Sequence, residues 1–233
     1  MENLNIGVLG GMGTYATIHL FKQYAEIFPA EKEWDRPRIV IDNRCTMPSR
    51  VRAFLYNENV DQLVAEMSDS MQYLTDAGCN RIILACNTSH LFLPKIYSRV
   101  PQLEDNVVNI IDNCVEKIRE DNISKVFLLG SEGTIESKVY QKKLGKFNIE
   151  CEVPDLDEYV LLRKCIEAVK QNVYTDEIKK IFIDLVGKHD SCVLGCTELP
   201  ILYKMYKKDI STSIVYDPLR LVLEKLREEF END

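Results

Sequence analysis

The sequence predicts an α/β protein made of two similar domains, each a mostly parallel sheet flanked by helices, related by a pseudo-twofold axis. Short β-branched apolar runs alternate with longer amphipathic stretches, and a strand-and-turn motif from the first half of the chain recurs in the second. The 233 residues are enough for one large or two small domains, and 45% hydrophobic with 28% charged residues is typical of a globular protein.

Buried strands are predicted where short runs of apolar, mostly β-branched residues stand together. In chain order these are residues 6–9, 39–41, 81–84, 126–129 and 192–194. Helices are predicted where apolar residues recur with a helical period, at residues 14–28, 57–77, 112–121, 134–146, 157–171, 175–188 and 217–232. Because each helix returns the chain to the same end of the sheet, this alternation favours parallel strands.

An internal repeat divides the chain into two halves. Residues Ile6–Thr14 match Val126–Thr134, with two glycines and the threonine in register, and a later strand of each half is followed by a cysteine, Cys86 or Cys196. We therefore expect two facing domains with a break near residues 101–105. The predicted first domain comprises residues 1–104 with 211–233, and the predicted second domain comprises residues 105–210.

The charge balance argues against nucleic-acid and membrane partners. There are 29 Lys and Arg against 37 Asp and Glu, a net charge of −8, so no basic surface is expected to attract phosphate groups or anionic lipid. The N-terminus, Met1–Asn5, is acidic where a signal peptide would be basic, and no apolar stretch approaches the roughly 18 residues of a spanning helix. We expect a cytoplasmic protein.

No cofactor is predicted. The three His and eight Cys include no Cys-x-x-Cys pair and no zinc-ligand spacing, so a metal is not expected. The turn at Gly10–Tyr15 lacks the Gly-x-Gly-x-x-Gly pattern of dinucleotide sites, and no lysine lies in a recognisable pyridoxal phosphate motif. The cysteines are expected to be thiols, because so long a chain needs no disulfides and the cytosol is reducing.

Two cysteines differ from the other six in their position. Cys86 and Cys196 each follow a predicted buried strand, which puts them at the carboxyl ends of the strands, where ligands bind in open parallel sheets. Backbone amides and helix N-termini there favour the thiolate, so the pair suits acid-base chemistry. The glycine turns at 10–13 and 130–133 allow backbone amides to approach an anion. The remaining cysteines, expected mostly in the core, are Cys45, Cys79, Cys114, Cys151, Cys165 and Cys192.

Four motifs resemble the aspartate/glutamate racemase family over nearly the whole chain. They are Gly7–Gly13 with Ala16-Thr17, Ala85–Thr88 with His90, Leu129–Thr134, and Leu194–Pro200. The resemblance implies cofactor-independent racemisation of an acidic amino acid held between the two domains. Cys86 and Cys196 would stand on opposite faces of the α-carbon, with Cys196 taking the proton from the L form and Cys86 from the D form.

The same resemblance implies which residues hold the substrate. Pro48-Ser49-Arg50 matches the family's carboxylate-binding arginine motif, and Lys170 matches its lysine, so both cations are expected to bind acidic groups. The expected substrate-binding residues are Gly11, Met12, Thr17, Arg50, Asn87, Thr88, Lys170, Thr197 and Glu198. The expected partner is a small acidic amino acid, and the expected assembly is a homodimer.

Departures from the family's pattern leave alternatives open. Thr14 replaces a proline, Ser49 an aspartate and Asn172 a glycine, and Asp217–Arg220 lacks the threonine and histidine that usually follow the aspartate. One alternative is a one-cysteine isomerase or decarboxylase of a small diacid, and another is a non-enzymatic amino-acid sensor of the same fold. His90 could equally be a catalytic residue or a helix residue whose ring nitrogens are simply hydrogen-bonded within the fold.

Overall fold

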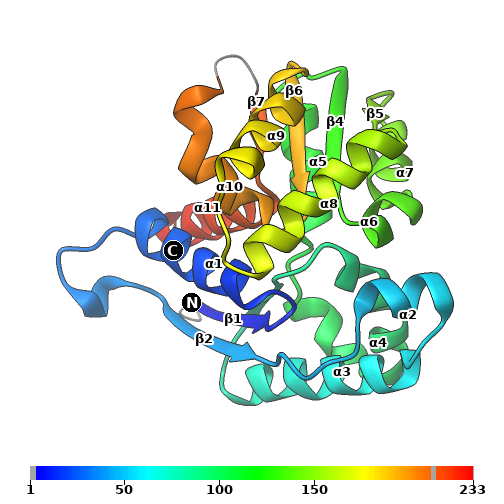
Figure 1. Cartoon of the computed structure of the whole chain (residues 1–233). Coiled ribbons are helices and arrows are strands. Elements are labelled where there is room, and N and C mark those ends of the chain that lie inside the picture. The colour runs from blue at the N-terminus through cyan, green and yellow to red at the C-terminus, as the bar shows by residue number, and fades with distance from the viewer. Residues whose placement is uncertain (1–3, 211–213, 233) are drawn as a thin grey trace. The chain divides into compact units, whose positions relative to one another are not determined.

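The computed structural model of the protein describes residues 4–210 and 214–232 (Figure 1). It contains two parallel sheets with helices packed against them, which confirms the predicted α/β class. The chain divides into two compact units, Met1–Ile110 with Leu219–Asp233 and Ile111–Pro218. The domain limits predicted at 104/105 and 210/211 stay predictions. In the described part of the chain, every helix is too short or too polar to cross a bilayer.

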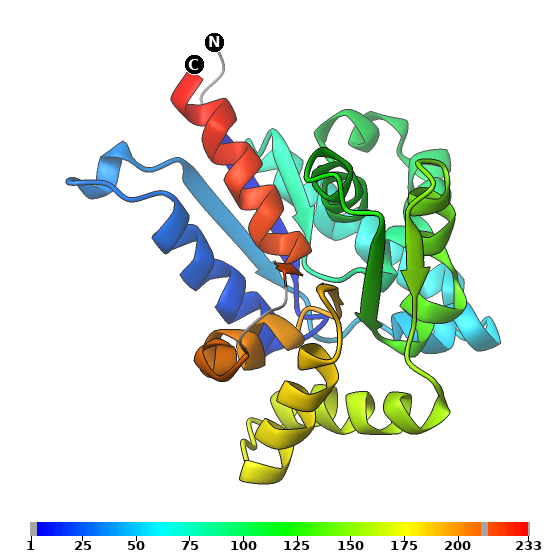
Figure 2. The same ribbon diagram turned by 90° about the horizontal axis from the view of Figure 1, so that it is seen from above.

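The first unit is built on a three-stranded sheet with β1 between β2 and β3 (Figures 1 and 2). Its elements are β1 (Asn5–Gly10), α1 (Thr14–Ile27), β2 (Arg38–Asn43), α2 (Arg50–Tyr56), α3 (Val60–Asp76), β3 (Arg81–Leu84), α4 (Leu93–Arg99) and α11 (Pro218–Asn232). Apolar residues recur every three or four positions along α3, so one face of this helix, including Met67, is fully buried. The C-terminal helix α11 packs on this unit through Phe230 against Phe28, with 6.1 Å between ring centroids, and through an ion pair of 3.1 Å between Glu229 and Arg81.

The second unit is built on a four-stranded parallel sheet in the order β5-β4-β6-β7. Its elements are α5 (Ile110–Glu120), β4 (Lys125–Gly130), α6 (Glu132–Glu136), α7 (Val139–Gly145), β5 (Glu150–Glu152), α8 (Leu156–Lys170), α9 (Asp176–Gly187), β6 (Ser191–Gly195), α10 (Leu199–Tyr206) and β7 (Ile214–Tyr216). Helices α8 and α9 bury their apolar faces with β4 and β6, and Leu162 and Phe182 are fully buried there. Burial on both faces explains why β4 and β6 are continuously apolar.

All five predicted strands are present, but the prediction of a single helix over 134–146 is wrong. The chain forms two short helices there, α6 and α7, because Lys138 adopts the left-handed conformation with φ 55° and ends the helical path. Strands β5 and β7 were not predicted, since each has only three residues and no clear alternation. The short helices α2, α4 and α10 also lack a pattern long enough to identify them.

Candidate active site

Cys86 lies just beyond the carboxyl end of β3 in the first unit. The Ala85 amide still donates to the Leu9 carbonyl of β1 at 3.0 Å, so the turn that carries Cys86 lies beside the glycine turn that follows β1. Cys86 is partly exposed. The first of the two predicted catalytic thiols is therefore at the edge of the sheet where parallel strands present ligand-binding loops.

The glycine turn after β1 is held by Thr17. Gly11 has a φ of +78°, and a Cβ on it would lie 2.4 Å from the carbonyl carbon of Arg44, so only glycine fits. The Gly11 amide donates to Thr17 Oγ1 at 3.1 Å, and that hydroxyl donates to the Gly13 carbonyl at 3.1 Å. Thr17 therefore holds the turn in place. Gly11 and Met12 were both predicted to bind substrate, but the Gly11 amide already donates its hydrogen bond to Thr17.

His90 has a structural role in the loop after Cys86. Its Nδ1 lies 2.9 Å from the Cys86 carbonyl, which can only accept, and its Nε2 accepts from the Ile110 amide at 3.4 Å. Both ring nitrogens are thus engaged by the backbone, and the neutral ring carries its proton on Nδ1. This arrangement favours a structural role for His90 over a catalytic one. The neighbouring Asn87 and Thr88 are buried at the same loop.

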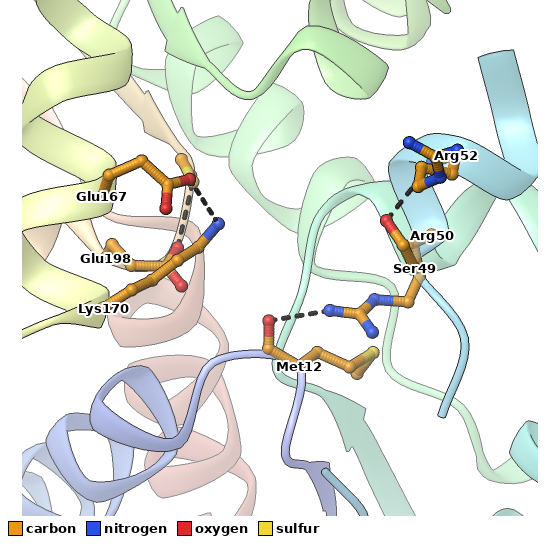
Figure 3. Close-up of polar contacts among 8 residues, drawn as sticks. Met12, Ser49, Arg50, Arg52, Glu167, Lys170 and Glu198 are labelled. Atoms are coloured by element: carbon orange, nitrogen blue, oxygen red, sulfur yellow. Dashed lines mark hydrogen bonds and ion pairs between the residues drawn. The ribbon is translucent and has the colours of Figure 1, made fainter. Parts of the chain in front are cut away.

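Arg50 begins α2, whose N-terminus is capped by the Ser49 hydroxyl accepting from the Arg52 amide at 3.3 Å. The guanidinium of Arg50 donates from Nη2 to the Met12 carbonyl at 2.9 Å (Figure 3). It also donates from Nη1 to the Pro48 carbonyl at 3.1 Å. Its Nε is buried without a hydrogen-bond partner, and within residues 4–210 and 214–232 the guanidinium makes no ion pair. Arg50 is therefore a fixed cation with one donor still to satisfy.

Cys196 occupies the corresponding place in the second unit. It directly follows Gly195, the last residue of β6, which pairs with Gly130, the last residue of β4. Cys196 and the two residues after it, Thr197 and Glu198, are all buried. The second predicted thiol thus lies beside the turn after β4, as the internal repeat implies.

A buried carboxylate contacts the Cys196 thiol directly. Cys196 Sγ donates to Glu198 Oε2 at 3.0 Å, while Glu198 Oε1 is buried with no hydrogen-bond partner. Glu198 is only 3% exposed, so water solvates this polar side chain poorly. A carboxylate so placed can hold the proton on the sulfur or receive it.

Lys170, the last residue of α8, supplies positive charge near this pair. Its Nζ donates to Glu167 Oε1 at 3.1 Å (Figure 3). Burial opposes the charge of Lys170, but attraction to Glu198, the hydrogen bond to Glu167 and attraction to Cys196 outweigh it and raise the pKa of the lysine. Lys170 is therefore a persistent cation whose charge is attracted to Glu198 and Cys196.

Tyr159 on α8 lies near the candidate site and was not predicted from the sequence. Burial, then the nearby Glu132 carboxylate, raises the pKa of its hydroxyl to about 12, and the charge of Cys196 contributes in the same direction. The phenol is thus a neutral hydrogen-bonding group near Cys196 at neutral pH. Nothing in the sequence distinguished it from other apolar-face residues of this helix.

A hollow elsewhere in the second unit does not include these residues. It measures about 370 Å³ and opens at the amino-terminal ends of β4 and β6, where Lys125, His189 and Ser191 line it. None of the predicted site residues lies there. Since ligands of open parallel sheets bind at the carboxyl ends, we give the strand-end cysteines more weight than this hollow. Among residues 4–210 and 214–232, no group of three or more His, Cys, Asp or Glu is arranged to hold a metal.

Comparisons with family models, solved structures and curated proteins all point to one family. The family model described as Asp/Glu/Hydantoin racemase matches residues 9–226. Aspartate racemase of Picrophilus torridus has a similar structure, with a TM-score of 0.81 and 27% identity over 97% of this chain and 94% of that one.

Curated relatives show similar levels of sequence identity. Glutamate racemase of Aquifex aeolicus is 24% identical over 74% of this chain, and the broad specificity amino-acid racemase of Bacillus subtilis is 26% identical over 83% of this chain and 85% of its own length. The chain spans 67% of the length of the Aquifex aeolicus enzyme and 57% of that of a Lactococcus lactis glutamate racemase. Because the family model covers most of the sequence, from strand β1 to helix α11, this chain belongs to the Asp/Glu/Hydantoin racemase family.

Proposed function

We propose that the protein racemises aspartate or glutamate without a cofactor, using Cys86 and Cys196 as paired acid and base. One observation supports this more than any other. In each unit the strand next to the central strand ends immediately before a cysteine-bearing turn, with β3 beside β1 and β6 beside β4. A mechanism with one thiol for each face of the substrate needs two thiols at corresponding positions, and the repeat supports such a pair.

In the proposed reaction, one thiolate removes the proton from the α-carbon and the other thiol donates a proton to the opposite face. Cys196 takes the proton from the L form, and Cys86 takes it from the D form. Glu198 serves Cys196: it accepts the thiol proton when Cys196 must act as the base, and the 3.0 Å contact supports this transfer. Fixed dipoles and cations around the substrate stabilise the negative charge that develops.

In this proposal, Arg50 and Lys170 explain why the enzyme prefers an amino acid with an acidic side chain. The buried Nε of Arg50, which lacks a partner, is satisfied when a substrate carboxylate binds to the guanidinium. Lys170, kept charged by Glu198 and Glu167, adds a second cation. A neutral amino acid would leave this charge uncompensated, so we expect aspartate or glutamate to be preferred over alanine. Asn87, Thr88, Thr197 and the Met12 amide complete the proposed contacts with the α-carboxylate.

Deuterium exchange in heavy water tests this proposal. Each thiol is replaced in turn, Cys86→Ser and Cys196→Ser, and the α-carbon of L- and D-aspartate and glutamate is followed by NMR. Serine is too weakly acidic to form its anion near neutral pH, so racemisation falls by orders of magnitude in both variants. Cys86→Ser still exchanges deuterium into the L substrate through Cys196, and Cys196→Ser does so only with the D substrate.

The alternatives give different results in the same experiment. A one-cysteine isomerase or decarboxylase would keep near wild-type turnover in one of the two serine variants. A non-enzymatic sensor would bind the amino acid with no exchange at the α-carbon in any variant, including the wild type. Either result would reject the two-thiol proposal.

A further inference from the structure

One hydroxyl holds both ends of the turn that follows β1. The Gly11 amide donates to Thr17 Oγ1 at 3.1 Å, and the same hydroxyl donates to the Gly13 carbonyl at 3.1 Å. Thr17 lies in the first turn of α1, is only 5% exposed and touches Gly10, where an added Cβ would be 2.6 Å from Thr17 Cγ2. A hydroxyl has one proton to donate, and the Thr17 hydroxyl donates it within the turn.

The Met12 carbonyl lies between these two fixed groups along the chain. It accepts a hydrogen bond of 2.9 Å from Arg50 Nη2 (Figure 3). Gly11, with a φ of +78°, is packed closely against the backbone of Arg44, so the turn meets the segment that leads to Arg50. Because Thr17 holds the groups on either side of it, the Met12 carbonyl has a fixed direction and can hold the guanidinium in one orientation.

Arg50 depends on this carbonyl for its orientation. The guanidinium donates to two backbone carbonyls, that of Met12 and, at 3.1 Å, that of Pro48. Pro48 is only two residues from Arg50 and moves with it, so the Met12 carbonyl is the contact that fixes the guanidinium relative to the glycine turn. The Nε of Arg50 is buried without a hydrogen-bond partner. A carboxylate that binds the guanidinium with two hydrogen bonds needs it at a defined angle, which the Met12 contact sets.

We propose that Thr17 is a positioning residue, which fixes the direction of the Met12 carbonyl and through it orients Arg50 toward the substrate's carboxylate. Thr17 thus contributes to the preference for acidic amino acids through Arg50 rather than by touching the substrate, the role that the sequence predicted for it. The hydroxyl proton donated to Gly13 supports this difference. The inference rests on the proposed function, because there Arg50 binds the acidic substrate.

Steady-state kinetics of Thr17 variants test this role. Thr17→Val removes the hydroxyl and keeps the shape of the side chain, so KM for aspartate or glutamate should rise about 5- to 10-fold, as for loss of one neutral hydrogen bond, while kcat stays nearly constant. A merely structural defect would lower kcat by reducing the amount of folded enzyme and would leave KM unchanged. Thr17→Ala is made in parallel, because it leaves room at the turn if valine hinders folding.

Two matched variants separate the hydroxyl from the rest of the side chain. Thr17→Ser keeps the hydroxyl and should keep KM near the wild-type value. An equal rise of KM in the serine and valine variants would overturn the proposal, because packing of the methyl group against Gly10 would then be the cause. Thr75→Val on α3 removes a hydroxyl that donates to the Met71 carbonyl at 3.1 Å, away from the glycine turn, and should leave kcat and KM unchanged.

A double-mutant cycle tests whether Thr17 acts through Arg50. In an Arg50→Ala background, Thr17→Val should cause no further loss of kcat/KM for the acidic substrate, because the group that the hydroxyl orients is absent. If the losses of the two single variants multiply instead, Thr17 acts independently of Arg50 and the proposal is wrong.

A measurement without turnover keeps this inference distinct from the proposed racemisation. Heteronuclear NMR should show the buried Nε–H of Arg50 protected from exchange with water, its signal being identified by its absence in Arg50→Lys. Thr17→Val should abolish this protection, because the Met12 carbonyl no longer holds the guanidinium. An inactive wild type that shows this loss of protection would reject the racemisation but support the role of Thr17. Unchanged protection in Thr17→Val would overturn that role whatever the activity.

Discussion

The contact between Cys196 and Glu198 gives the two proposed catalytic thiols unequal surroundings. The Cys196 thiol donates to a buried carboxylate, whereas the loop of Cys86 is held by side-chain hydrogen bonds from Ser89 and His90 to the Cys86 carbonyl. A carboxylate at hydrogen-bond distance can act as the immediate destination of the thiol proton. We therefore propose that Glu198 takes part in proton transfer at Cys196 rather than in substrate binding alone.

Replacing Glu198 by Gln should lower kcat/KM by about 100-fold, the lower range for loss of a proton-transfer group. The amide keeps the size of the side chain but cannot receive the proton. The value of kcat/KM should fall by the same factor for L-to-D and D-to-L racemisation, because the L and D forms have equal free energies.

The matched control is Glu167→Gln, which removes the other carboxylate beside Lys170 but does not contact the thiol. It should keep a kcat/KM close to that of the wild type. If both glutamine variants lowered kcat/KM equally, Glu198 would act only through Lys170, and its role in proton transfer would be rejected.

Replacing Arg50 by Ala should reduce kcat/KM for aspartate and glutamate by about 10- to 150-fold. This corresponds to about 1.5–3 kcal/mol for a hydrogen bond to a charged group. Exchange at the α-carbon of alanine, which has no side-chain carboxylate, should change much less. The control is Arg52→Ala on the same helix, whose guanidinium is exposed and paired with Glu58 at 2.7 Å. Equal losses for alanine and aspartate would show that Arg50 does not recognise the acidic side chain.

The sequence predicted where the two thiols would lie but not what surrounds them. Cys86 and Cys196 follow recognisable buried strands, and the end of a parallel strand has a fixed place at the edge of the sheet. The bond from Cys196 to Glu198 and the approach of Tyr159 depend on side-chain rotamers and on how α8 packs. Periodicity carries no information about either.

At the scale of elements, length decided what could be predicted. The central strands β1, β4 and β6 and the long helices have enough apolar residues to show a period, whereas the three-residue strands β5 and β7 do not. The break between α6 and α7 was missed because it occurs at a lysine. Lysine is a good helix former, and only the backbone reveals that Lys138 is left-handed.

That break gives a prediction about stability. Lys138→Gly should stabilise the protein by about 0.5–1 kcal/mol, because glycine adopts a positive φ without the steric cost that lysine bears there. The control Lys142→Gly, in the interior of α7, should destabilise it by about 1 kcal/mol. Unfolding in urea measures both. A destabilising Lys138→Gly would mean that the lysine side chain, rather than the backbone, matters at this position.

At the scale of the whole molecule, buried thiols should make stability depend on alkaline pH. Burial raises the pKa of Cys151, Cys165 and Cys192 to about 12 in each case, and it raises the pKa of Cys114 further. The Cys192 thiol donates to the Val186 carbonyl at 3.7 Å, which also keeps its proton in place. In the unfolded chain the same thiols ionise at about pH 8.5.

The free energy of unfolding should therefore fall as pH rises above about 8.5, because the unfolded chain then holds fewer protons than the folded one. Each buried thiol contributes up to about 1.4 kcal/mol per pH unit until its folded pKa, about 12 for Cys165 and Cys192, is reached. Urea unfolding at a series of pH values between neutral and alkaline measures this slope. The double variant Cys165→Ala with Cys192→Ala removes two of the groups, so its stability should be lower at neutral pH but should decline less steeply. An equally steep decline in that variant would assign the alkaline sensitivity to groups other than these thiols.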